Sequence, residues 1–424
     1  MIGSLIPILE ETANLTGKSV MNRAFFQTTL SKRAPRALLL AVMMTGALTL
    51  GVVQQAQGQI GGAAVVFLMI EPDSRAAGMG NAGVAMADNA NAIFWNPAGL
   101  ADQVGTEAAL THSNWLPEFN AGLFYEYLVA KHHIDGWGTL GAHVTYLFLG
   151  EHEYRDAQNN LLGEFRSYDL AVGVSYGFKV GKNLSLGTGL RLIYSSLANV
   201  TVGAQDTNPG VSAGFDVGAL YKTSPFGLGG ATGQYNIGFN LANMGPKIQY
   251  SDSEQSDPIP TNLRFGHAFT LEFDEFNKIT FVNDFSKMLI RQRATETCID
   301  PNDTSTCTIN FESDPFYKAI FSAWSPIEVR SNPLNETEEE FESLSALEQL
   351  IISTGFEYWY NNLFAVRGGY FYENPYNGDR QFLTFGAGIR YNIVGVDFSY
   401  VYALEENHPL ANTMRFSLLL NFAK

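Results

Sequence analysis

The chain has 424 residues, of which 46% are hydrophobic, 13% aromatic and 16% charged, and its formal net charge is −16. So many aromatic residues and so few charges, together with 41 glycines, disfavour an average cytosolic enzyme. Beyond the amino terminus the sequence has no apolar run of about 18 residues or more, which excludes a bundle of membrane helices.

The amino terminus is the first predicted element. An apolar run at Ala37–Val53 follows a basic cluster at 32–36 and precedes a small-x-small site, Ala56-Gln57-Gly58. This order of basic, apolar and small residues is typical of an export signal. We predict that residues 1–58 are a signal peptide with an upstream extension, cut near Gln59. The alternative is that the rather long apolar run remains as a membrane anchor.

The next segment, residues 59–105, is rich in glycine and alanine and lacks the alternation of strands. Small residues pack closely, and we predict that this segment is a hatch that plugs a lumen. Its stretch Gly78–Gly83 formally matches the dinucleotide motif G-x-G-x-x-G. No βαβ unit follows the motif, however, and an exported chain is separated from nucleotide pools. We therefore expect no nucleotide and no other cofactor.

Between residues 106 and 422 one pattern recurs about fourteen times, with an apolar side chain at every other position. Because successive side chains of a strand point to opposite faces, one face would meet lipid and the other a polar lumen. A water-soluble sandwich shows the same alternation, but export and the absence of long apolar runs favour an outer-membrane barrel. The predicted fold is all-β: a 14-stranded antiparallel transmembrane β-barrel over 106–424, with the hatch at 59–105. Strands are predicted near 106–113, 119–131, 137–149, 165–179, 183–198, 211–222, 233–243, 261–273, 276–289, 351–360, 363–373, 381–392, 394–403 and 412–422.

The connections between these strands are alternately tight and long. Tight ones, such as 180–182 and 361–362, follow even-numbered strands, whereas long polar ones, such as 150–164, follow odd-numbered strands. Periplasmic turns of outer-membrane barrels are short and outer loops are long. We therefore predict that both barrel ends lie at the periplasm and that 290–350 is a long extracellular loop.

Charged residues of both signs recur on the predicted lumen face. Opposite charges can neutralise one another, so the favoured interpretation is that these residues pair internally and brace the barrel. The alternative is a ring of charges that selects ions. The residues are Asp169, Arg191, Asp216, Arg264, Arg390, Asp397 and Arg415.

The long loop contains both cysteines and an acidic stretch. In an oxidising compartment Cys298 and Cys307 favour a local disulfide over free thiols. No second cysteine pair or spaced histidine pair accompanies them, so no metal is expected. Residues 335–350 place apolar side chains at helical spacing, which predicts a short amphipathic helix. Its acidic face is either the solvated side of a lid or a docking surface for a basic partner. The candidate docking residues are Glu338, Glu339, Phe341, Leu344 and Leu347.

Motifs that carry catalysis are absent from the sequence. H-E-x-x-H, G-x-S-x-G and paired C-x-x-C do not occur, and no spacing supports a catalytic triad. We therefore predict no enzyme activity.

Several stretches are similar to a known family. The sequence NPAGL at 96–100, after a Gly/Ala-rich stretch, resembles the hatch of the FadL superfamily of outer-membrane barrels. The sequence FLMIEPDSRAAGMGNAGVA at 67–85 resembles the opening of the PorV/PorQ family of the type IX secretion system of Bacteroidota. Further similar stretches are 240–248, 259–264, 364–371, 383–388 and 412–417. The hatch residues that carry the resemblance are Asp73, Arg75, Gly78, Gly80, Gly83, Asn96 and Pro97. The chain departs from the family at Gly99–Leu100 and at 322–333.

The resemblance implies a shuttle in the cell outer membrane. It would bind the carboxy-terminal signal domain of secreted cargo leaving the large outer-membrane translocon. It would then deliver the cargo to the surface attachment complex that contains the PorU sortase. Outer-membrane lipid would surround the barrel, and no nucleic-acid partner is expected. The main alternative is a FadL-type channel for hydrophobic small molecules, which predicts an apolar pocket between hatch and wall.

Overall fold

The computed structural model describes residues 62–156, 158–197, 201–202, 205–206, 208–250, 256–298, 307–330, 341–405 and 408–422. The predicted export signal at 1–58 lies outside these residues. Among the described helices, none is both long enough and apolar enough to cross a membrane.

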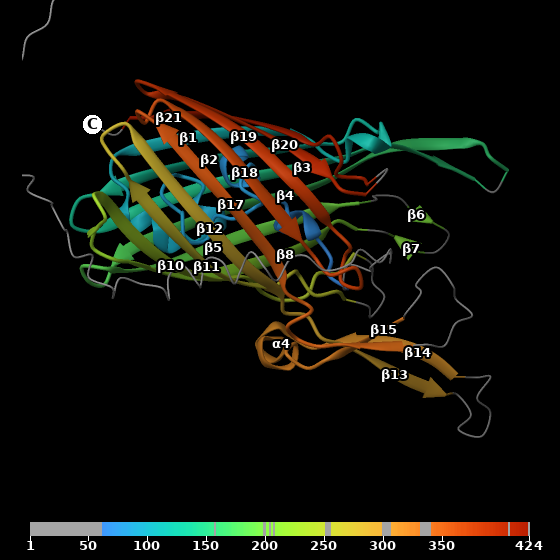
Figure 1. Ribbon diagram of the computed structural model, residues 1–424. Coiled ribbons are helices and arrows are strands. Elements are labelled where there is room, and N and C mark those ends of the chain that lie inside the picture. Colours follow the sequence, from blue (N-terminus) through green and yellow to red (C-terminus); the bar gives the residue numbers. More distant parts are fainter. Residues whose placement is uncertain are drawn as a thin grey trace, which may run out of the picture. The chain divides into compact units, whose positions relative to one another are not determined.

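Fourteen antiparallel strands close into a barrel, which confirms the predicted fold class (Figure 1). The first strand pairs with the last, and β10 pairs with β11, so that the sheet has no open seam. The strands are β1 (Thr106–Asn114), β2 (Phe124–Ile134), β3 (Gly138–Arg155), β4 (Leu161–Lys179), β5 (Leu184–Ser196), β8 (Gly210–Lys222), β10 (Ala231–Met244), β11 (Asn262–Glu272), β12 (Asn277–Met288), β17 (Ile351–Tyr360), β18 (Phe364–Tyr372), β19 (Gln381–Tyr391), β20 (Val394–Ala403) and β21 (Met414–Asn421).

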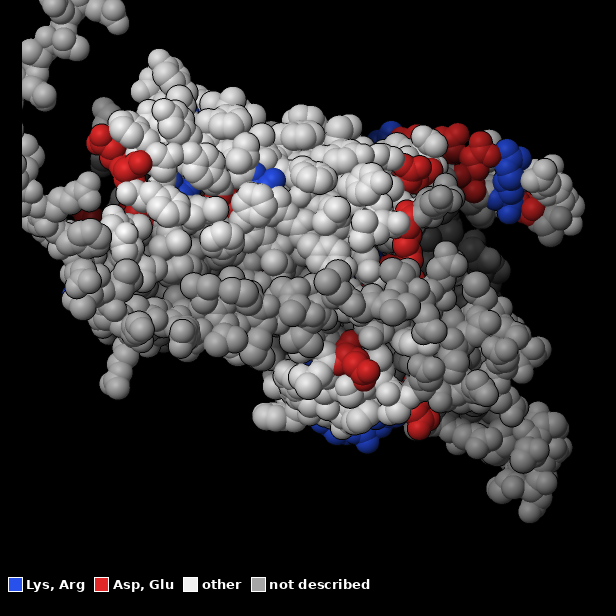
Figure 2. Space-filling model, viewed as in Figure 1, with Lys and Arg blue, Asp and Glu red and all other residues white. Residues whose placement is uncertain are grey.

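All fourteen predicted strands are present, and most boundaries agree within two or three residues. The largest difference is the β3–β4 hairpin, which continues as a ladder to Arg155 and Leu161, past the predicted ends. Charged residues replace apolar ones on this hairpin, and Figure 2 shows acidic side chains gathered on it. Lipid does not cover this part of the strands, so the apolar alternation that marks the rest of the strands is lost there.

The outer wall is apolar and carries a band of aromatic rings. Leu190 and Leu192 of β5 are exposed on it, and Figure 2 shows that much of the wall in view is free of charged side chains. Toward the long-loop end, the rings of Tyr146 and Tyr168 lie 5.7 Å apart, and those of Tyr168 and Tyr194 lie 5.9 Å apart. Such aromatic girdles mark the membrane interfaces of outer-membrane barrels.

The tight connections are built by residues that tolerate left-handed backbone. Asn361 and Asn362 have φ values of 55° and 49°, and Asn392 has 54°. Asparagine accepts this conformation at little cost. The connection at 223–232, which is longer than the alternation rule predicts, contains a short strand, β9 (Phe226–Leu228), that pairs with the start of β10.

The loops carry further short elements. They are β6 (Thr201–Val202), β7 (Gln205–Asp206), β13 (Gln292–Cys298), β14 (Cys307–Ser313), α4 (Phe316–Ser322), β15 (Ile327–Arg330), β16 (Phe341–Leu344) and, between β1 and β2, the 3₁₀ turn η3 (Pro117–Phe119). The helix predicted over 335–350 is wrong for 341–344, because this stretch pairs with β15 as a strand. Pairing with a distant segment overrides the helical spacing of its apolar residues. Glu338 and Glu339 lie outside the described residues.

The segment before β1 folds inside the barrel (Figure 1). Its elements are η1 (Val66–Met69), α2 (Ser74–Ala77), α3 (Ala92–Trp95) and η2 (Pro97–Asp102). At the long-loop end, the Ala64 amide donates to the carbonyl of Pro258 at 3.0 Å. At the tight-turn end, Asp102 forms ion pairs with Lys179 and Lys222 at 2.7 and 3.0 Å. This hatch segment, residues 62–105, therefore runs the length of the lumen.

Candidate functional site

The contact between hatch and wall is made by glycines of the wall. A Cβ atom at Gly187 would lie 2.2 Å from the carbonyl carbon of Pro97, and one at Gly369 would lie 2.1 Å from the amide nitrogen of Gly80. No Cβ fits against backbone at such distances, so glycine is required at these positions. Lumen glycines on five strands meet the backbone of the hatch in this way: Gly177, Gly187, Gly238, Gly355 and Gly369. On two further strands, a Cβ atom at Gly218 would meet the Asn96 side chain at 2.2 Å, and one at Gly386 would lie 3.1 Å from the Cα atom of Gly78.

Asp73 and Asn96 hold the hatch together and fix it to the wall. The Asp73 carboxylate caps α2 by accepting from the Ala76 amide at 2.8 Å, and it also accepts from the Trp95 indole. The Asn96 side chain donates to the carbonyl of Ala219 in β8 at 2.9 Å and accepts from the Ala98 amide. Pro97 follows as the first residue of η2, where its missing N–H costs nothing.

The three glycines of the G-x-G-x-x-G match are wall contacts. Gly78 packs against Gly386. Gly80 has a left-handed φ of 69°, and its amide donates to Thr384 Oγ1 at 2.8 Å. The Gly83 amide donates to Asp284 Oδ2 at 2.6 Å. The glycine spacing is thus explained by packing of the plug.

A chain of ion pairs, buried at its centre, ties Arg75 to the four consecutive strands β17, β18, β19 and β20. The Arg75 guanidinium donates to Glu357 of β17 twice at 2.8 Å, and Glu357 also accepts from Arg367 Nε at 2.7 Å. Each link pairs opposite charges in the order Asp88, Arg75, Glu357, Arg367, Asp397 and Arg390. Sequence reasoning placed Arg390 and Asp397 on the lumen face but missed Glu357 and Arg367. The outward Phe356 and Tyr358 on either side of Glu357 were the signal that could have found it.

The other lumen charges follow the predicted pairing only in part. Arg191 and Asp216 form a buried ion pair. Arg264 instead lies over the Phe94 ring at 4.5 Å from its centroid, and Asp169 accepts from Ser195 at 2.5 Å. Arg415 has no carboxylate partner among the described residues. An aromatic ring thus replaces the carboxylate partner at Arg264, and a hydroxyl group replaces the guanidinium partner at Asp169.

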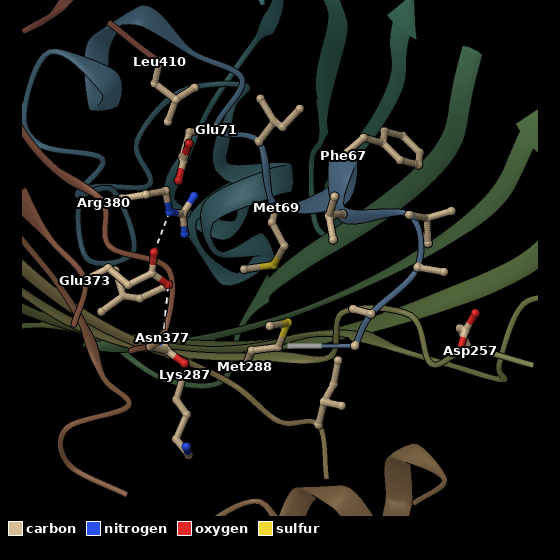
Figure 3. Close-up of a pocket in the computed structure, with 18 of the residues that line it drawn as sticks. Phe67, Met69, Glu71, Asp257, Lys287, Met288, Glu373, Asn377, Arg380 and Leu410 are labelled. Carbon is tan, nitrogen blue, oxygen red and sulfur yellow. Dashed lines mark hydrogen bonds and ion pairs between the residues drawn. The ribbon is translucent and has the colours of Figure 1, made fainter. Parts of the chain in front are cut away.

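Above the hatch, the long-loop end of the lumen opens into a cavity of about 1670 Å³. Figure 3 shows its floor, where Phe67 and Met69 come from the hatch. On one side Arg380 pairs with Glu373 at 2.5 Å. Arg415 also lines the cavity and is 3% exposed, and its Nε and Nη1 atoms have no hydrogen-bond partner in the described part of the chain. The cavity therefore combines an apolar floor with charged walls.

Of the candidate docking residues, Leu344 and Leu347 have described side chains, and these two do not share one surface. Phe341 begins β16, Leu344 at the end of this strand is buried, and Leu347 in the following turn is 75% exposed. Cys298 and Cys307 lie directly opposite one another where β13 pairs with β14. Directly opposed residues of an antiparallel pair are close enough for a disulfide. The disulfide stays a prediction. Within the described part of the chain, no cluster of three or more His, Cys, Asp or Glu could hold a metal ion.

Comparisons with known proteins bear on this architecture. Residues 53–295, more than half of the chain, match the family model described as "Type IX secretion system protein PorV". No curated protein matches the chain. Three solved structures are distantly similar in fold. The toluene transporter TbuX of Ralstonia pickettii is 12% identical, with 83% of this chain and 98% of that chain covered and a TM-score of 0.42.

The other two are a FadL homologue of Pseudomonas aeruginosa and the toluene transporter TodX of P. putida. The FadL homologue is 12% identical, with coverage of 85% and 100% and a TM-score of 0.38. TodX is 13% identical, with coverage of 82% and 100% and a TM-score of 0.43. The closed barrel and the family match give one conclusion. The chain belongs to the PorV family and is an outer-membrane β-barrel component of the type IX secretion system.

Proposed function

We propose that this barrel is a shuttle for secreted proteins and has no catalytic role. It binds the carboxy-terminal signal domain of cargo as the cargo leaves the outer-membrane translocon, and it delivers the cargo to the attachment complex containing the PorU sortase. The observation that carries the proposal is the hatch, which lies against wall glycines on seven strands. A lumen occupied in this way supports a function on the loops and outer wall.

The proposal requires the long loops to face outside the cell. Residues 59–105 would be the hatch of the mature protein, and 290–350 an extracellular loop. Ala63 lies next to the loop-end contacts of the hatch, whereas Lys182 lies in a tight turn. In a Cys298→Ser/Cys307→Ser background, we expect a membrane-impermeant thiol reagent to label Ala63→Cys on intact cells and to label Lys182→Cys only after lysis. Labelling of Lys182→Cys on intact cells would reverse the assigned orientation.

The loop that carries β15 and β16 is the proposed cargo surface. We expect replacement of residues 327–347 by a short Gly/Ser linker to weaken capture of a cargo signal domain at least about tenfold, the equivalent of about 1.4 kcal/mol. The barrel should keep its melting temperature, because β15, β16 and the turn after β16 lie outside the strands of the barrel. The measurement is a pull-down with purified signal domain.

A shortened β3–β4 hairpin, lacking residues 153–163, is the matched control for the loop replacement. It also removes a loop-end projection, and it should leave capture unchanged. Equal capture by the 327–347 variant and the wild type would remove this loop from the proposal. Affinity isolation from native membranes then tests the shuttle itself, because the chains bound to the barrel should share a carboxy-terminal signal domain.

The loop-end cavity favours a second candidate function, a channel for hydrophobic small molecules. Its floor includes the apolar side chains of Phe67, Met69 and Ile70. Such a channel would bind a fatty acid or a detergent tightly in the cavity. Tight binding of this kind, together with capture that does not depend on residues 327–347, would support the channel over the shuttle.

A further inference from the structure

An exposed aromatic stripe runs along α4 in the long loop. Tyr317, Phe321 and Trp324 are 65%, 79% and 42% exposed. Their spacing of four and three residues places them along one face of the helix and its extension. Ala319 and Ala323, on the opposite face, are buried. The helix therefore turns Tyr317 and Phe321 away from the protein.

The position of α4 is fixed by Asp314, just before the helix. Its carboxylate forms ion pairs with Lys318 at 2.8 Å and Arg293 at 3.2 Å, and it accepts from Ser322 at 2.7 Å. Burial raises the pKa of Asp314, but the hydrogen bonds from Lys318 and Ser322 and the charge of Arg293 outweigh it and hold the pKa at about 2. Asp314 is thus ionised at neutral pH, and its contacts join α4 to β13.

Trp324 lies beside a lysine on the outer wall of the barrel. Lys287 has the parity of the outward residues of β12, such as the exposed Phe281, and Figure 3 shows its side chain on the opposite side of the strand from that of Met288. Its ammonium group lies 5.8 Å from the centroid of the Trp324 ring and donates to Gln349 Oε1 at 2.5 Å. The side chain is only 2% exposed as a result. The loop therefore folds over the rim of the outer wall at this strand.

Measured along the barrel axis from the tight-turn end, Lys287 lies at the border of the apolar band of the wall. It lies ten residues beyond Asn277, the tight-turn end of β12. At about 3.3 Å per residue and a strand tilt of about 40°, this is about 25 Å, the usual height of the apolar band of such barrels. Tyr168, in the aromatic girdle, lies eleven residues from the tight-turn end of β4 at Lys179. Trp324, which lies beside Lys287, is therefore at about the same position along the barrel axis as the aromatic girdle.

We propose that Tyr317, Phe321 and Trp324 rest in the lipid interface at the long-loop end and anchor the long loop to the membrane surface. On β3, β4 and β5 the aromatic side chains of the girdle belong to the strands themselves. On β12 the wall carries Lys287 at this level, and the three loop residues supply the aromatic side chains instead. The partner of the stripe is the lipid itself, since it adjoins the lipid-facing wall and has the composition of an interfacial belt.

Depth measurement by a spin label tests the anchor. The full chain, in a Cys298→Ser/Cys307→Ser background, carries a nitroxide at Phe321→Cys in phosphatidylcholine vesicles. Val174→Cys on the wall is the lipid reference, and Leu162→Cys on the β3–β4 hairpin is the exposed apolar control. We expect the ratio of oxygen to nickel-chelate collisions at Phe321→Cys to lie between those of the two references. A ratio equal to that of Leu162→Cys would overturn the proposal and leave the stripe as a protein-docking surface.

A second measurement does not depend on a label at the stripe. In vesicles, the double variant Tyr317→Ser/Phe321→Ser should expose the long loop to trypsin, with cleavage about tenfold faster than in the wild type. Leu162→Ser should leave the cleavage rate unchanged. Equal cleavage of wild type and double variant would contradict the anchor, because the loop would then be held without the stripe.

Discussion

Replacing Glu357 with glutamine is expected to loosen the hatch and let the barrel conduct ions. Glu357 is 1% exposed and accepts two hydrogen bonds from Arg75 and one from Arg367. The chain of ion pairs from Asp88 to Arg390 contains three acidic and three basic groups. The substitution therefore leaves one buried positive charge uncompensated. Breaking a buried ion pair from one side costs about 3–5 kcal/mol. Arg75 is the hatch residue in this chain, and its attachment to the wall should be the part that is lost.

Conductance in planar bilayers and thermal unfolding in detergent measure this effect. Glu357→Gln should show frequent channel openings and a lower melting temperature than the wild type. Glu151→Gln is the control, because its partner Arg166 lies on the exposed β3–β4 hairpin, where an ion pair contributes little. The double variant Arg75→Met/Glu357→Gln should recover part of the lost stability, since it removes one cation and restores the balance of charge in the chain. A closed, fully stable Glu357→Gln barrel would show that the charge chain does not hold the hatch.

The strands were the most predictable part of the molecule. Lipid on one side and a polar, glycine-rich lumen on the other impose a strict period of two, and this period is visible in a single sequence. The predicted strand at 351–360 coincides with β17, and the one at 394–403 with β20. The prediction failed at 150–164, where the β3–β4 hairpin leaves the membrane. Water on both faces of the hairpin removes the alternation of apolar residues there.

The hatch was predictable as a plug but its attachments were not. Density in glycine and alanine indicated close packing, but it could not indicate what the small residues would pack against. The partners are far apart in the chain: Arg75 and Glu357 are 282 residues apart, and Gly80 and Thr384 are 304 residues apart. Only the closed barrel brings these segments together. In the sequence, a lumen glycine that contacts the hatch cannot be distinguished from any other small residue at an inward position.

The acidic loop was the least predictable part. Phe341, Leu344 and Leu347 have helical spacing, yet the first two belong to a strand that pairs with β15. The strand places Leu344 in a buried position and leaves Leu347 exposed in the turn. The aromatic stripe of α4, in contrast, lies in the segment 322–333 and just before it, where the chain departs from its family, and its role could not be carried over.

A methyl group at Gly369 is expected to separate the hatch from the wall, whereas the same group at Gly368 should be harmless. Both glycines belong to β18, and neither has a left-handed φ, so alanine fits the backbone at both positions. Replacing such a glycine removes freedom from the unfolded chain and stabilises by about 0.4–1 kcal/mol where space allows. The two variants therefore differ only in what the new Cβ atom meets.

At Gly369 that atom would lie 2.1 Å from the amide nitrogen of Gly80 and 2.2 Å from the carbonyl carbon of Met79. Both are backbone atoms, so the hatch must move as a whole. The movement would stretch the 2.8 Å bond from the Gly80 amide to Thr384. At Gly368, on the outer face, the nearest atom is 2.8 Å away at the edge of the Phe356 ring, which can turn aside.

Gly369→Ala should therefore destabilise the barrel by about 1–3 kcal/mol, the usual cost of overpacking, while Gly368→Ala leaves the melting temperature equal or slightly higher. Thermal unfolding of both proteins in the same detergent gives the comparison. If both substitutions had the same effect, the backbone of the hatch could not be in contact with β18. Changes in melting temperature of opposite sign would mean that the hatch is held by the shape of the wall as well as by its charges.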